Sequence, residues 1–86
     1  MPKKIIFCAH AENKFRILNK HGLKITKAQI TDVIINAENT FESERSRKIA
    51  QKPFDSEYLL RVIFEETDKL ITVITFYPAK RSRYEH

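Results

Sequence analysis

The sequence predicts an α+β domain in which two helices precede an antiparallel sheet, in the order β-α-α-β-β-β. Two observations support this prediction. Apolar residues recur at helical spacing between residues 11 and 37. After residue 57 the pattern changes to two β-type apolar runs, "YLLRVIFEE" and "KLITVITFY", which meet at an acidic hairpin connection. We expect the two helices to pack on one face of this sheet.

The composition is that of a globular protein. The chain has 86 residues, of which 42% are hydrophobic and 31% charged, so we expect residues 1–86 to form one domain with a thin core. No apolar run approaches the roughly 20 residues of a membrane helix. The single cysteine, Cys8, cannot form an internal disulfide. These features predict a cytoplasmic protein in which Cys8 is a buried structural thiol.

The N-terminal segment predicts a short strand and a first helix. "KKIIFCAH" has an apolar, β-prone centre and is interpreted as the strand. In the segment that follows, Ala11, Phe15 and Leu18 lie on one helical stripe. Gly22, the only glycine, stands where a helix commonly ends in the left-handed conformation.

The second helix has the clearest sequence signature. It begins at Thr26 with "TKAQ", a Thr-x-x-Gln capping box. Its apolar face consists of Ile30, Val33, Ile34 and Ala37. The residues of "NAENT" predict its end between positions 36 and 39.

Two strands are predicted next. "SERSRKIAQKPF" is interpreted as a basic edge strand, because a proline such as Pro53 cannot donate to a central ladder. In "YLLRVIFEE", alternation places Leu60, Val62 and Phe64 on one face. Arg61 then lies on the other face, with Leu59 and Ile63.

The last strand is apolar on both faces. Strict alternation places Ile71 and Val73 on one face, and Leu70, Ile74 and Phe76 on the other. Because two helices cover only one face of a small sheet, the remaining face is expected to be a concave site or a partner-binding surface.

Basic residues gather in two places. The formal net charge of +5 favours a polyanion or an acidic protein as a partner. One basic set is Lys80, Arg81 and Arg83, directly after the last strand. The other set, Arg45, Arg47, Lys48 and Lys52, lies in the middle of the chain.

The C-terminal half, "LLRVIFEETDKLITVITFYPAKRSRY", resembles a small family of bacterial and archaeal proteins. Their chains end in a strand pair close to "LRVVYEE…ITVITFYP", followed by a basic tail. The N-terminal half agrees with this family at His10, at Arg16, in "HGLKITKAQI" and in "RKIAQKP". This family is related to the BrnT toxins and more distantly to the RelE and ParE toxins.

The resemblance implies a compact α+β fold and an endoribonuclease toxin that acts on mRNA, on or off the ribosome. It also implies a small DNA-binding antitoxin as partner. No metal ion and no other cofactor is expected. Without a metal, RNA cleavage needs a base for the 2′-hydroxyl, positive charge at the phosphate and an acid for the leaving oxygen.

The candidate residues follow from this chemistry. Arginine holds two phosphate oxygens at once and stays charged, which nominates Arg61, Arg81 and Arg83. The candidate proton carriers are Lys80, Tyr77, Tyr84 and His10. Tyr77 and Tyr84 can also stack on bases, and Arg45, Arg47 and Lys48 of the mid-chain set are expected to contact RNA.

Other interpretations remain open at this point. The basic tail can equally be a solvated chain end or an antitoxin contact. The protein can be a non-catalytic module that binds RNA, DNA or another protein, or an inhibitor of gyrase of the ParE type.

Overall fold

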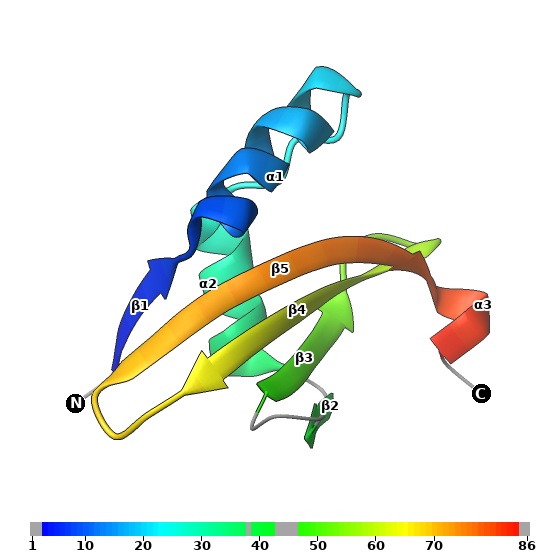
Figure 1. Cartoon of the computed structure of the whole chain (residues 1–86). Coiled ribbons are helices and arrows are strands. Elements are labelled where there is room, and N and C mark those ends of the chain that lie inside the picture. Colours follow the sequence, from blue (N-terminus) through cyan, green and yellow to red (C-terminus); the bar gives the residue numbers. More distant parts are fainter. Residues whose placement is uncertain (1–2, 38, 43–46, 85–86) are drawn as a thin grey trace.

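The structure is a computed structural model that describes residues 3–37, 39–42 and 47–84, except for the side chains of residues 39, 83 and 84. Its elements are β1 (Lys4–Phe7), α1 (Ala9–Lys20), α2 (Lys27–Asn36), β2 (Asn39–Glu42), β3 (Arg47–Pro53), β4 (Tyr58–Glu66), β5 (Leu70–Lys80) and α3 (Arg81–Tyr84). The predicted α+β class is confirmed. The β4–β5 hairpin and the N-terminus lie at one end of the sheet, and α3 lies at the other (Figure 1).

The sheet differs from the prediction in the number of its strands and in the relative direction of one pair of strands. Its five strands have the order β1-β5-β4-β3-β2. β1 is parallel to β5, whereas the other neighbours are antiparallel. The sequence interpretation missed β2 and was therefore wrong in making β3 an edge strand. Pro53 is tolerated because it is the last residue of β3, beyond the segment from Lys48 to Gln51 that pairs with β2.

The predicted helix signals are confirmed. The N–H of Gln29 donates to Thr26 Oγ1 at 3.2 Å, and the N–H of Thr26 donates to Gln29 Oε1 at 2.8 Å. These are the two bonds of a capping box. Gly22 has φ +85° after the end of α1. Because α1 already begins at Ala9, His10 lies in its first turn.

Loss of the cap is expected to destabilise the fold modestly. Thr26→Ala leaves the N–H of Gln29 without its acceptor, and we expect the free energy of unfolding to fall by about 1 kcal/mol in urea titrations. Thr31→Ala is the matched control, because Thr31 lies inside α2 and does not cap it. An equal loss in the two variants would contradict the capping role.

Both long helices pack on the same face of the sheet. The Phe15 ring of α1 lies 4.6 Å from the Phe76 ring of β5, measured between centroids. Ile30 and Val33 of α2 are buried in the same cluster as Val62 of β4. We call the opposite side of the sheet the second face. It is buried only in places, for example at Leu59 and Ala79, which lie outside the main core.

A β-bulge at Ile74 changes the pattern of β5. Ile63 pairs with Thr75, but Phe64 pairs with Val73, so Ile74 is the extra residue. The alternation of β5 is therefore broken at Ile74, and the residues that follow it lie on the opposite face from the one that strict alternation predicts. The expectation that Phe76 lies opposite Ile71 and Val73 is wrong, since all three belong to one core.

Cys8 joins the end of β1 to this bulge. Its N–H donates to the carbonyl of Val73 at 3.0 Å, and its thiol donates to the carbonyl of Ile74 at 3.2 Å. The thiol is half-buried against the core, which is a structural environment. Among the described residues, no helix has the length and apolar character needed to span a membrane.

Candidate functional site

Three polar side chains lie in one row across the second face. Gln51 of β3 pairs with Arg61 of β4, which pairs with Tyr77 of β5. The expectation that Arg61 lies opposite Leu60, Val62 and Phe64 is confirmed, because these three belong to the helix-side core. Tyr77 is on the side of Arg61 only because the bulge shifts β5 by one residue.

The Tyr77 ring is held between two cations. The guanidinium carbon of Arg61 lies 5.9 Å from the ring centroid, and Lys14 Nζ of α1 lies 5.7 Å from it. Lys14 Nζ also donates to Thr75 Oγ1 at 3.5 Å. All four residues, Lys14, Arg61, Thr75 and Tyr77, are partly exposed to solvent. The group can therefore offer a planar guanidinium to a phosphate, next to an aromatic ring on which a base can stack.

Gln51 completes the row from the interior of the sheet. It is 4% exposed, and within the described part of the chain its Oε1 has no hydrogen-bond partner. Sequence reasoning missed both Gln51 and Lys14. A glutamine between alanine and lysine in a strand was the available signal for the first. Lys14 has no distinctive signal, since it reaches Tyr77 only through the placement of α1.

The basic tail is attached to the domain at Arg81, the first residue of α3. The N–H of Arg81 donates to the carbonyl of Glu57 at 2.9 Å, and its Nη1 donates to the carbonyl of Asp55 at 3.2 Å. Lys80 pairs with Tyr58 and is exposed. By the alternation of β4, this position lies on the same face as Leu60 and on the opposite face from Arg61. The side chains of Arg83 and Tyr84 lie outside the described residues, although their backbone forms α3.

The remaining candidates are dispersed. Arg47 pairs with Glu65 at 3.4 Å on the second face, four residues along β3 from Gln51. Lys48 lies on the helix side, and Arg45 falls outside the described residues. His10 is exposed in α1, and no described hydrogen bond or ring contact joins it to Arg61 or Tyr77. The row of Gln51, Arg61 and Tyr77 is therefore the site the structure assembles.

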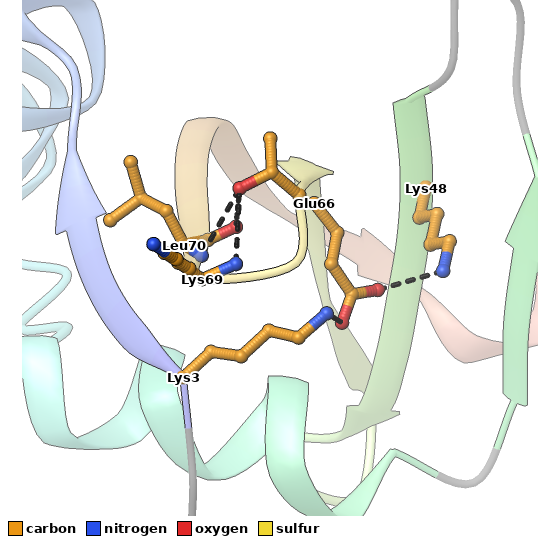
Figure 2. A network of polar contacts seen from close by, with 6 residues as sticks. Lys3, Lys48, Glu66, Lys69 and Leu70 are labelled. Carbon is orange, nitrogen blue, oxygen red and sulfur yellow. Dashed lines mark hydrogen bonds and ion pairs between the residues drawn. The ribbon is translucent and has the colours of Figure 1, made fainter.

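A second charged cluster lies on the helix side, near the β4–β5 hairpin. Glu66 accepts hydrogen bonds from Lys3 Nζ at 2.8 Å and from Lys48 Nζ at 2.7 Å, which approach it from two sides (Figure 2). These two bonds, that of Lys3 first, hold the pKa of the Glu66 carboxyl below its ordinary value. The bond to Glu66 also raises the pKa of Lys48.

The cluster predicts a specific pH dependence. Because the pKa of Glu66 is lower in the folded state, its stabilisation is complete above the ordinary value of 4.5 and is lost as the pH falls through the folded-state value. Glu66→Gln should therefore lower stability at neutral pH and flatten its decline below pH 4.5, as measured by urea titrations across pH. Glu65→Gln removes the same charge on the second face. An equal flattening there would contradict the assignment.

Comparisons with known proteins support the fold. No protein-family model matches the chain, and no curated protein sequence does. The structure is similar to the BrnT ribonuclease toxin of Brucella abortus, with a TM-score of 0.60 and 24% identity, over 92% of this chain and 99% of BrnT.

YafQ of E. coli is also similar. Two of its structures, one of them a mutant, give TM-scores of 0.58 and 0.57 at 13% identity, over 99% of this chain and 100% of YafQ. The resemblance to BrnT found in the sequence is thus confirmed at the level of structure. The chain has the fold that BrnT and YafQ share.

Proposed function

We propose that this protein is a toxin-type endoribonuclease that cleaves mRNA without a metal ion and is inhibited by a small antitoxin protein in the cytoplasm. The observation that supports this most directly is the Arg61–Tyr77 pair on the sheet face opposite α1 and α2. The fold shared with BrnT, described as a ribonuclease toxin, agrees with this proposal. The net charge of +5 suits a polyanionic substrate.

The proposed reaction is attack of an RNA 2′-hydroxyl on its neighbouring phosphate. The new O–P bond forms as the bond to the 5′-oxygen breaks, which leaves a 2′,3′-cyclic phosphate and a 5′-hydroxyl. In this proposal Arg61 binds the non-bridging oxygens and stabilises their charge in the transition state. Tyr77 stacks against a flanking base, and Lys14 adds positive charge beside it.

Proton transfer is assigned to the tail. Of the nominated carriers, Lys80 starts from the other side of the sheet and His10 has no described contact with the row. Tyr84, with Arg83 beside it in sequence, is the last residue of α3, the short helix that follows β5 directly, and it is our proposed partner of Arg61. Arg81 has its guanidinium on the carbonyl of Asp55, where it fixes the start of α3.

The test is expression from a tightly controlled promoter, with growth and mRNA integrity followed together. We expect growth arrest with new mRNA 5′ ends in primer extension, and the same cleavage by the purified protein on RNA oligonucleotides. Arrest with intact mRNA would instead indicate a gyrase-type target. Normal growth with intact mRNA would contradict the toxin proposal.

One observation favours a second candidate, a non-catalytic RNA-binding module. Beside Tyr77 the structure places the two cations Lys14 and Arg61, a grouping that binds phosphate and stacks on a base without any proton transfer. Purified protein that binds single-stranded RNA in a salt-dependent manner and leaves it intact would support this candidate.

A further inference from the structure

Gln51 carries a buried hydrogen-bond acceptor on the second face of the sheet. The residue is 4% exposed, and it is the one buried polar residue among those whose burial the structure describes. Within the same part of the chain, its Oε1 accepts no hydrogen bond. A buried amide oxygen without a donor destabilises a fold. The acceptor therefore adds nothing to the stability of the protein without substrate, which points to a donor that reaches it when the site is occupied.

Among the described side chains, Arg61 carries the donor next to this acceptor. Gln51 pairs directly with Arg61 in the β3–β4 ladder, on the same face, where opposite Cβ atoms lie about 4.5–5.5 Å apart. The other described neighbours on that face, along β3 and diagonally on β4, are the apolar residues Ile49, Pro53, Leu59 and Ile63. The side chain of Asn39, which pairs with Gln51 from β2, lies outside the described residues. Arg61 Nε is buried as well, so a bond between the two atoms requires no further desolvation.

A glutamine suits this position better than a charged residue. A carboxylate opposite Arg61 would bind its guanidinium through two N–H groups and cancel the charge that attracts a phosphate. The amide oxygen of Gln51 is uncharged. A guanidinium has five N–H donors, so a bond from Nε leaves the two Nη groups for the phosphate. Gln51 can therefore orient Arg61 without weakening its attraction for RNA.

The contact between Arg61 and Tyr77 leaves a task for this acceptor. In the protein without RNA, the guanidinium carbon lies 5.9 Å from the ring centroid. A cation–π contact fixes the distance of a guanidinium from a ring but not the rotation of its plane. Bidentate binding requires that plane to be aligned with two phosphate oxygens. A hydrogen bond from Nε to a side chain on the neighbouring strand supplies this constraint.

We propose that Gln51 is a positioning residue for Arg61. When a phosphate binds the two Nη groups, Gln51 Oε1 accepts a hydrogen bond from Arg61 Nε, and the guanidinium is held from both sides in one plane. The inference deepens the proposed function and rests on it in one respect, that Arg61 is the phosphate ligand. It does not require that the bound RNA be cleaved.

The direct test follows the Nε–H signal of Arg61 by nuclear magnetic resonance of the full-length protein, with Arg61→Lys to assign the signal. The probe is a single-stranded oligonucleotide with 2′-O-methyl riboses, which carries phosphates but has no attacking hydroxyl. We expect the oligonucleotide to slow solvent exchange of this N–H by about 10-fold or more in the wild type, and hardly at all in Gln51→Met. The Nε–H of Arg16, which is exposed on α1, is the internal control and should not change. Equal slowing in the wild type and in Gln51→Met would overturn the proposal.

Stability and cleavage together distinguish a positioning role from a structural one. Gln51→Met keeps the length of the side chain and removes the acceptor. We expect its urea midpoint to equal or exceed that of the wild type, and its rate of RNA cleavage to fall by about 10-fold. Ile49→Met is the matched control, because Ile49 lies two residues along the same face of β3 and should leave the rate unchanged. A lower urea midpoint with unchanged cleavage in Gln51→Met would make Gln51 a structural residue and overturn the proposal.

The outcomes separate this proposal from the nuclease proposal. Wild-type protein that leaves RNA intact but shows the Gln51-dependent slowing would contradict cleavage and support the role of Gln51. Wild-type protein that cleaves RNA, with the same Arg61 exchange rate in the presence and absence of the oligonucleotide, would contradict the role of Gln51 alone. An unchanged exchange rate overturns the positioning role whether or not RNA is cleaved.

Discussion

Arg61→Ala is expected to reduce RNA cleavage by about 100- to 1,000-fold, the usual cost of removing one donor that stabilises a developing oxyanion. The guanidinium of Arg61 is held over Tyr77, 5.9 Å from its ring centroid, on a rigid strand between two neighbours. A cation fixed in this way needs little reorganisation when charge develops on the phosphate. Single-turnover cleavage of an RNA oligonucleotide measures the effect, with circular dichroism to verify the fold.

Two control variants make this prediction specific. Arg61→Lys keeps the charge but loses the planar fork, so we expect an intermediate loss. Arg16→Ala removes the same charge from the exposed face of α1, where Arg16 donates only to Asn13 Oδ1 among the described contacts, at 2.8 Å. We expect nearly full activity in Arg16→Ala. Equal losses in Arg16→Ala and Arg61→Ala would indicate a general charge effect and remove Arg61 from the site.

Local signals made much of the fold predictable. The capping box at Thr26, the left-handed Gly22 and the alternation in β4 each depend on a few neighbouring residues, and the structure confirms all three. The parallel pairing of β1 with β5 is a long-range choice that no local pattern encodes. β2 was missed because its four residues, "NTFE", lack a long alternating run.

The site was only partly predictable, because part of it also depends on how distant strands pair. Arg61 could be placed by alternation, since β4 is regular around it. Tyr77 could not, because the bulge at Ile74 reverses the faces of every residue that follows it in β5. A bulge depends on the pairing with the neighbouring strand, and β5 is apolar on both faces, so its sequence shows no break in alternation.

Phe76→Ala is expected to be the most destabilising substitution, with a loss of about 3–5 kcal/mol in the free energy of unfolding. Phe76 is fully buried at 0% exposure, and its ring lies 4.6 Å from that of Phe15, which fastens α1 to β5. Small domains have a total stability of about 5–15 kcal/mol, so this loss is a large part of the whole. Urea titrations of the wild-type protein and of Phe76→Ala measure this loss.

Phe41→Ala is the matched control and also tests the bulge. Phe41 pairs with Ile49, which pairs with Ile63, so it lies on the second face, where it is 45% exposed. If β5 alternated without a break, Phe76 would occupy that same face and the two losses would be similar. Because the bulge turns Phe76 into the core, we expect Phe41→Ala to cost less than about 1 kcal/mol. Similar losses in the two variants would contradict the bulge, and with it the placement of Tyr77 beside Arg61.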